Sequence, residues 1–175
     1  MEIVIINGRP GVGKDAFVET VKSLIGEFRC YHYSTVDFVK FVATCAGWRG
    51  EKTAENRLFL SDLKKLLSDW NDVPYKKTKT EIADCMSIAA GNGCLGESVM
   101  FIHCREPEEI DRLKKDFDAH TLLVKRAAAE IVISNPSDGN VFNYDYDVII
   151  ENNGDLDELR ESARTYITEI LGLTI

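Results

Sequence analysis

Apolar residues along the chain form two alternating kinds of pattern, and each kind predicts a different element of secondary structure. Short, nearly unbroken apolar runs are typical of strands in a parallel sheet that helices cover on both faces. Five short β-rich runs, most of them apolar in this way, predict strands at residues 2–7, 29–33, 98–104, 120–125 and 146–151. Between them, apolar residues recur every three or four positions, as on one face of a helix. This alternation predicts an α/β fold with a mainly parallel sheet.

Local signals mark the starts of several predicted helices. Helical spacing begins at three positions, Lys14, Thr53 and Thr80. A lysine-rich stretch at residues 76–79 is most simply the solvated start of the last of these helices. Pro107 suits the first turn of a further helix. Asp155, followed three residues later by Glu158, resembles a capping box that opens the final helix of the chain.

The predicted strands are unevenly spaced. Residues 34–97, between the second and third strands, carry only helical patterns. We interpret the segment at about residues 38–95 as a helical insertion mounted on the sheet rather than as a separate domain. No internal repeat, linker or low-complexity stretch divides the sequence, so residues 1–175 are expected to form a single domain.

Composition and charge narrow the classes of partner. The chain has 21 Lys and Arg against 29 Asp and Glu, which gives a net charge of −8 at pH 7. A surface of this sign repels phosphate backbones and anionic lipid, so nucleic acid and membranes are disfavoured as partners. No apolar run reaches the roughly 18 residues of a membrane-spanning helix, and the N-terminus lacks the basic start of a signal peptide. The five cysteines are odd in number and lack Cys-x-x-Cys spacing, which favours reduced thiols and a cytoplasmic location.

A glycine-rich segment follows the first predicted strand. Residues 8–14, Gly-Arg-Pro-Gly-Val-Gly-Lys, match the pattern Gly-x4-Gly-Lys and open the first predicted helix. We call residues 8–14 the phosphate loop, because backbone N–H groups and a helix N-terminus converge on a phosphate in this arrangement. The residues expected to bind a nucleoside triphosphate are Gly8, Arg9, Gly11, Val12, Gly13, Lys14, Asp15 and Ala16. An ordinary glycine-rich turn is the alternative interpretation.

The position after Lys14 departs from the usual pattern. Ser or Thr normally stands there and provides a hydroxyl ligand to Mg²⁺, whereas this chain has Asp15. A carboxylate is also a suitable hard-oxygen ligand for Mg²⁺, so Asp15 is a candidate metal ligand. Alternatively, Asp15 is only an acid in the first turn of a helix, where the helix dipole favours negative charge.

The chain resembles the nucleoside monophosphate kinase branch of P-loop proteins. The Gly-Lys-Asp ending of the loop is similar to that of phage deoxynucleoside monophosphate kinases and animal-type phosphomevalonate kinases, and residues 34–37, 99–109 and 146–159 match more loosely, also with dephospho-coenzyme A kinase. The resemblance implies a three-layer P-loop kinase fold whose five-stranded parallel sheet has the order 2-3-1-4-5. It also implies a helical substrate-binding region and a lid at about residues 126–144.

The activity implied by this resemblance is transfer of the γ-phosphoryl group of ATP, with Mg²⁺, to a small phosphorylated acceptor. A nucleoside or deoxynucleoside monophosphate is the favoured acceptor, and a monomer or a homodimer is expected. Arg105 matches an arginine of the related deoxynucleotide kinases and is expected to bind the acceptor and the transferred group, although it could instead pair with Glu108 or Glu109 on the surface.

Four further residues are candidates for the site, Arg57 by its place in the helical insertion and the other three by the same resemblance. Asp37 is a candidate general base or outer-sphere Mg²⁺ ligand, or simply an acid at a helix start. Arg57 is a candidate ligand of the acceptor phosphate, or an exposed helix arginine. Arg126 stands where the lid arginines of these kinases begin, with a basic strand end as the alternative. Asn153 stands where P-loop kinases commonly hold adenine, and Asn and Gly would also form an ordinary turn there.

One expected acid is missing. A conventional Walker B strand ends in Asp, but in the third predicted strand the apolar residues 99–102 are followed by His103, which is more simply a strand-end histidine than a ligand. This departure favours a second hypothesis, in which the chain is a nucleotide-binding or regulatory P-loop protein with degraded catalysis. A GTPase switch is disfavoured, because the chain contains neither Asn-Lys-x-Asp nor Asp-x-x-Gly.

Overall fold

The computed structural model describes residues 1–51, 53–129 and 141–175. The chain divides into two compact units, one formed by Met1–His32 with Cys85–Ile175 and the other by Tyr33–Asp84. The first unit carries most of the sheet and the phosphate loop, and the second unit is mainly helical. The expectation of one domain over residues 1–175 stays a prediction.

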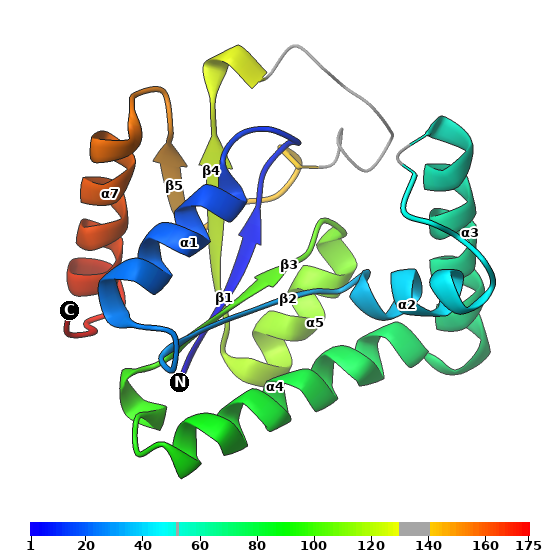
Figure 1. Ribbon diagram of the computed structural model, residues 1–175, viewed down its shortest axis with the longest axis horizontal. Coiled ribbons are helices and arrows are strands. Elements are labelled where there is room, and N and C mark those ends of the chain that lie inside the picture. Colours follow the sequence, from blue (N-terminus) through cyan, green and yellow to red (C-terminus); the bar gives the residue numbers. More distant parts are fainter. Residues whose placement is uncertain (52, 130–140) are drawn as a thin grey trace. The chain divides into compact units, whose positions relative to one another are not determined.

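The sheet has five strands in the order β2-β3-β1-β4-β5, as predicted (Figure 1). The strands are β1 (Glu2–Asn7), β2 (Cys30–Ser34), β3 (Val99–His103), β4 (His120–Lys125) and β5 (Val148–Glu151). The pairings of β1 with β3, β1 with β4 and β4 with β5 are parallel. The carboxyl ends of these strands therefore meet at one edge of the sheet, which is where open α/β sheets bind their ligands.

The last strand begins two residues later than the apolar pattern predicted, and Asp147 explains the difference. Its carboxylate accepts hydrogen bonds from the backbone N–H and the hydroxyl of Thr121, at 2.8 and 2.7 Å, and its own N–H donates to that hydroxyl. Before Val148, these side-chain bonds take the place of backbone hydrogen bonds between the strands β4 and β5. Burial raises the pKa of Asp147, but the bonds from Thr121 and from Lys114 outweigh it and hold the pKa below its usual value.

Within the described part of the first unit, three main helices accompany the sheet. They are α1 (Lys14–Ile25), α5 (Pro107–Phe117) and α7 (Leu156–Thr165), the last continuing into a π-helical turn at Tyr166–Ile170. Pro107 stands at the start of α5, as expected. Asp155 caps α7, since its carboxylate accepts from the N–H groups of Asp157 and Glu158 at 2.9 and 3.0 Å. Among the described residues, no helix is both long enough and apolar enough to cross a bilayer.

Helices cover both faces of the sheet, as the unbroken apolar runs predicted. On one face, α1 and α7 lie side by side (Figure 1). The core on that side includes Val4, Ile6, Phe17, Val21, Phe101, Val124, Leu159 and Ile167. Alternate strand residues point the other way, and α5 contacts β1. Buried residues of this second set include Ile3, Ile5, Met100, Ile102, Ile110 and Leu113. The α/β fold with strand order 2-3-1-4-5 is thus confirmed.

The second unit contains α2 (Asp37–Cys45), α3 (Ala54–Asn71) and most of α4 (Val73–Gly91). The lysine-rich stretch at residues 76–79, predicted as a helix start, lies inside α4. The helix begins earlier because Asp72 adopts a left-handed conformation (φ 53°) that ends α3, and its carbonyl then accepts from Lys76 N–H at 3.0 Å. Of the lid expected at about residues 126–144, residues 130–140 lie outside the described residues.

Candidate phosphate-binding site

The phosphate loop has the context that the sequence predicted, between strand β1 and helix α1. Its glycines adopt positive φ, with 147° at Gly8, 82° at Gly11 and 97° at Gly13. Such angles strongly favour glycine. Gly13 is the N-cap of α1 and its carbonyl accepts from Phe17 N–H at 2.9 Å. The first turn of α1 therefore directs its backbone N–H groups at the loop, where an anion is favoured.

Gly8 also passes very close to a neighbouring strand. A Cβ atom built on Gly8 would lie 2.4 Å from the carbonyl oxygen of Val124 in β4 and 2.9 Å from Cγ2 of Val12. No ordinary side chain fits that space. The sheet order explains this contact, since β4 is hydrogen-bonded directly to β1.

The ammonium group of Lys14 folds back over the loop. Its Nζ donates hydrogen bonds to the carbonyl oxygens of Gly8 at 2.6 Å and Arg9 at 2.9 Å. Two further cations lie nearby around the ring of Phe142. The guanidinium of Arg9 is 4.5 Å from the ring centroid and Nζ of Lys125 is 5.6 Å from it. Although the whole chain is acidic, this edge of the sheet gathers positive charge.

A buried amide and a buried phenol attach the loop to a later part of the chain. Asn7 accepts from Gly8 N–H at 2.8 Å through Oδ1 and donates through Nδ2 to the hydroxyl of Tyr146 at 2.7 Å. That hydroxyl donates to the carbonyl of Val141 at 2.9 Å. Burial raises the pKa of Tyr146 to about 12, so the phenol stays protonated at neutral pH. The start of the loop is thus held by a donor–acceptor chain that the sequence analysis missed.

Asn152, at the end of β5, is a second residue that the sequence analysis missed. Its N–H donates to the carbonyl of Lys125 at 2.7 Å, and its Nδ2 donates to the carbonyl of Val12 at 2.9 Å. A Cβ on Gly13 would lie 2.3 Å from that Nδ2. The expected residue, Asn153, is exposed, and its Oδ1 accepts from Ala127 N–H at 2.8 Å. The role of Asn153 beside a nucleotide base stays a prediction.

We expect Asn152→Ala to destabilise the protein by about 1–3 kcal/mol, because it removes a buried donor and leaves the carbonyl of Val12 unsatisfied. Urea unfolding of the variant measures this. Asn153→Ala is the matched control, since its amide lies on the surface one residue away and should change the stability by less than about 0.5 kcal/mol. Equal stability of the two variants would mean that Asn152 does not hold the loop.

A cavity of about 220 Å³ lies beside the loop and the start of α1. It is lined by Gly13, Ala16, Arg126, Asn152, Gly154, Asp155, Leu156 and Leu159. Three of the expected site residues, Gly13, Ala16 and Arg126, therefore come together here. The wall combines a guanidinium with two leucines, which suits a flat ring that carries polar edges.

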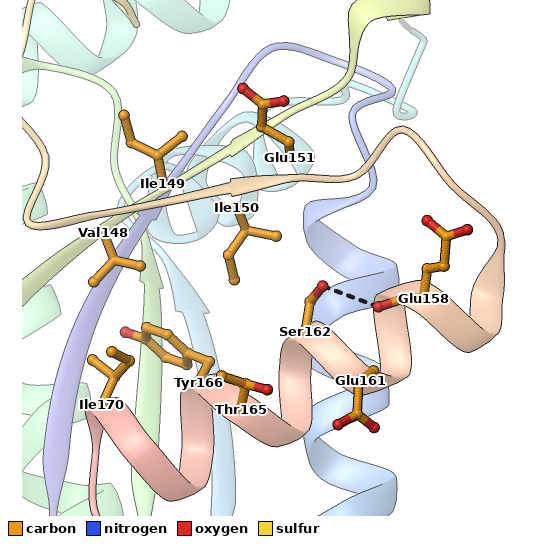
Figure 2. A pocket seen from close by; sticks show the side chains of 10 residues that line it. All are labelled: Val148, Ile149, Ile150, Glu151, Glu158, Glu161, Ser162, Thr165, Tyr166 and Ile170. Atoms are coloured by element: carbon orange, nitrogen blue, oxygen red, sulfur yellow. Dashed lines mark hydrogen bonds between the residues drawn. The ribbon is translucent and has the colours of Figure 1, made fainter.

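A larger cavity, of about 540 Å³, lies between β5 and α7 (Figure 2). It is lined by Val148, Ile149, Ile150, Glu151, Glu158, Glu161, Ser162, Thr165, Tyr166 and Ile170. None of these residues belongs to the phosphate loop, and the lining carries acids without a lysine or arginine. The larger cavity therefore offers no cation to a phosphate, whereas the smaller one contains Arg126.

Asp15 is the residue of the loop region best suited to a metal ion. Its side chain is 95% exposed, and Nδ1 of His103 lies 4.0 Å from its Oδ1. Within the described part of the chain, no group of three or more His, Cys, Asp or Glu side chains is arranged to hold a metal. A nucleotide-bound Mg²⁺ needs only one or two protein carboxylates, because phosphates and waters complete its shell. The donor set at Asp15 fits that requirement.

Three other expected site residues are placed as follows. Arg105 lies two residues after the end of β3, at the carboxyl edge of the sheet, and is half-buried. Asp37 belongs to the second unit, where its carboxylate accepts from Ser34 N–H at 3.0 Å and pairs with Lys40 at 2.8 Å at the start of α2. Arg57 is an exposed residue of α3 in the same unit. Their roles stay predictions.

No protein-family model matches the chain, and no curated protein matches it. The chain does, however, match several solved structures. An unliganded sugar kinase from a Janibacter species has a TM-score of 0.51 and 15% identity over 100% of this chain and 99% of that one. A protein described as a kinase from Chloroflexus aurantiacus has a TM-score of 0.45 and 10% identity over 94% and 97%. A shikimate kinase from Aquifex aeolicus has a TM-score of 0.44 and 9% identity over 97% and 99%. At 15% identity, the likeness to the sugar kinase establishes a shared fold.

Proposed function

We propose that this protein is an ATP-dependent small-molecule kinase that transfers a γ-phosphoryl group to a phosphorylated acceptor. The observation that carries the proposal is the phosphate loop itself. It joins a buried strand to the N-terminus of α1, its glycines adopt positive φ, and the ammonium of Lys14 lies over its carbonyls. Phosphoryl transfer depends mostly on positioning and on neutralising charge, and a loop of this kind provides both.

The donor nucleotide would lie along the loop. The β- and γ-phosphates would accept from the backbone N–H groups that open α1, and Lys14 would leave the loop carbonyls to bind them. The base would enter the 220 Å³ cavity, where Arg126 can lie against a flat ring and Leu156 and Leu159 provide apolar contact. Asn153 stands between Asn152 and Gly154, which both line this cavity. ATP as the donor is part of the proposal.

Asp15 would hold the divalent cation that accompanies ATP in this proposal. When bound, such a cation neutralises charge on the β- and γ-phosphates. The carboxylate of Asp15 is exposed and directly follows Lys14, so it can reach a phosphate-bound ion without rearrangement of the backbone.

The favoured acceptor is a nucleoside or deoxynucleoside monophosphate, because of the resemblance of the loop and of residues 99–109 to kinases of that branch. Arg105 would bind the transferred group from the end of β3. Asp37 would act as general base or outer-sphere metal ligand, and Arg57 would bind the acceptor phosphate. A lid at about residues 126–144 would exclude water, which otherwise accepts the phosphoryl group.

A second candidate function is nucleotide binding without phosphoryl transfer. The observation that favours it is His103, which stands where a catalytic acid normally ends the strand next to β1. A coupled assay of ADP release over a panel of phosphorylated acceptors separates the two functions. The kinase proposal expects release that depends on one acceptor class and is lost in Lys14→Ala. Tight ATP binding with no acceptor-dependent release from any member of the panel would favour the second function.

We expect Arg105→Ala to lower the rate of phosphoryl transfer by about a hundredfold or more while changing ATP affinity little, because the guanidinium would contact the transferred group. Arg105→Lys should also be impaired, since an ammonium cannot bind phosphate oxygens bidentately. Steady-state kinetics with the identified acceptor measure both effects. Arg112→Ala, on an exposed position of α5, is the control. Normal acceptor kinetics in both Arg105 variants would mean that Arg105 contacts neither the acceptor nor the transferred group.

A further inference from the structure

Two positions that normally hold the metal in P-loop proteins both carry unusual residues in this chain. A Ser or Thr usually follows the loop lysine, and an Asp provides the second position. Here Asp15 follows Lys14, and His103 ends the strand beside β1. Taken one at a time, each substitution looks like a loss. Taken together, they place a carboxylate on the helix where a hydroxyl is usual and an imidazole on the strand where a carboxylate is usual.

The sheet register brings these two residues together. His103 pairs with Ile6, two residues before the phosphate loop begins. Val99 and Phe101 pack in the core beneath α1, and side chains two residues apart along a strand share a face. His103 continues that series and therefore faces α1, whose second residue is Asp15. The Nδ1 of His103 lies 4.0 Å from Oδ1 of Asp15.

The two donor atoms are close enough to share an ion after a small shift of the Asp15 side chain. An ion that takes an imidazole nitrogen and a carboxylate oxygen at about 2.1 Å each keeps the donors about 3.0 Å apart at adjacent positions and at most about 4.2 Å apart. The side chain of His103 is 19% exposed and that of Asp15 is 95% exposed, so the strand residue is held while the helix residue can adjust. Phosphate oxygens and waters would complete the coordination.

We propose that Asp15 and His103 together hold the divalent ion of the bound triphosphate, and that this pair selects a transition-metal ion such as Mn²⁺ over Mg²⁺. The inference rests on the proposed triphosphate binding at the loop. Mg²⁺ prefers a shell of oxygen ligands, whereas imidazole nitrogen is a good ligand for first-row transition ions. Replacing one carboxylate oxygen by a nitrogen therefore weakens Mg²⁺ binding relative to Mn²⁺.

The chain offers a matched control for this pair. Nε2 of His120 lies 3.7 Å from the carboxylate of Glu2, so it is another histidine beside an acid. His120 and Glu2 stand at the amino ends of β4 and β1, at the edge of the sheet opposite the phosphate loop. If the loss of any imidazole beside a carboxylate changed metal binding, replacing either histidine would have the same effect. A shared metal ion instead makes Mn²⁺ binding depend on His103 and not on His120.

The test uses Mn²⁺ with inorganic triphosphate, a probe that contains no nitrogen. Binding of triphosphate is measured by calorimetry, binding of Mn²⁺ by the loss of its free-ion electron paramagnetic resonance signal, and nitrogen coordination by electron spin echo modulation. In protein with ¹⁵N-labelled histidine we expect modulation from one imidazole nitrogen. His103→Gln should abolish it and weaken Mn²⁺ binding at least about tenfold, with a smaller change for Mg²⁺. His120→Gln should change neither.

A double variant tests the exchange of residues directly. Asp15→Ser with His103→Asp restores the usual hydroxyl and carboxylate, so the ratio of Mn²⁺ to Mg²⁺ affinity should fall about tenfold without loss of triphosphate binding. Should the His103 variants fail to fold, the labelled parent protein still decides the question. Mn²⁺ and triphosphate bound without nitrogen coupling would overturn this inference and leave the proposed function standing. Failure of the parent protein to bind triphosphate would overturn both.

Discussion

Replacing Lys14 with alanine is expected to lower phosphoryl transfer by roughly a hundred- to a thousandfold, the usual cost of losing one preorganised group that stabilises transferred charge. The ammonium lies over the loop, within hydrogen-bonding distance of the carbonyls of Gly8 and Arg9. It is therefore already beside the place where the β- and γ-phosphates would lie. Calorimetry with ATP and the acceptor-dependent assay of ADP release measure the two parts of the effect.

The variant should stay folded, because Lys14 is only partly buried and its bonds join neighbouring parts of one loop. Lys22→Ala provides the control. It removes a lysine from the same helix, two turns further on, where its ammonium pairs with Glu27 at 3.1 Å. Lys22→Ala should bind ATP as the parent protein does. Unchanged ATP affinity and turnover in Lys14→Ala would mean that residues 8–14 are a glycine-rich turn and not a phosphate loop.

Replacing Gly8 with alanine is expected to have the largest effect on stability, about 4 kcal/mol or more. The backbone at Gly8 has φ 147°, a conformation that is essentially restricted to glycine. In addition, the new Cβ would lie 2.4 Å from the carbonyl oxygen of Val124, a backbone atom of a central strand that cannot move alone. Thermal unfolding should show a melting temperature at least about 8 °C lower, or no folded protein.

Gly11→Ala separates the two causes of this loss. Gly11 also has a positive φ, 82°, but a Cβ there would meet nothing within 4 Å. The conformational cost alone is about 1–2 kcal/mol, so the melting temperature should fall by about 2–8 °C. A Gly8→Ala variant as stable as Gly11→Ala would contradict the close approach of the loop to β4.

The fold was largely predictable because its signals are local. Most strands are apolar runs, and most helices repeat apolar residues along one face, so the elements could be placed without knowledge of their neighbours. Two of the five strands, β1 and β4, have the predicted bounds, whereas β5 begins later because Asp147 bonds to Thr121. That bond joins residues 26 apart, and spacing along the chain does not reveal it.

The details of the candidate site depend instead on distant parts of the chain. Asn152 contacts Val12 across 140 positions of sequence, and Asn7 contacts Tyr146 across 139. The resemblance to P-loop kinases favoured Asn153, and asparagine next to glycine by itself predicts only a turn. A polar residue directly after the last strand, at the ligand-binding edge, is the signal that could have indicated Asn152.

The sequence by itself determined the α/β alternation and the loop at residues 8–14 between a strand and a helix. Both arise from short-range spacing of glycine, lysine and apolar residues. Only the tertiary structure decided that His103 faces Asp15, that β4 excludes a side chain at Gly8, and that Asn152 holds the loop. The physical reason is the sheet order. Pairing β1 between β3 and β4 brings the ends of strands that are far apart in the chain to one edge, and the contacts made there follow from that pairing.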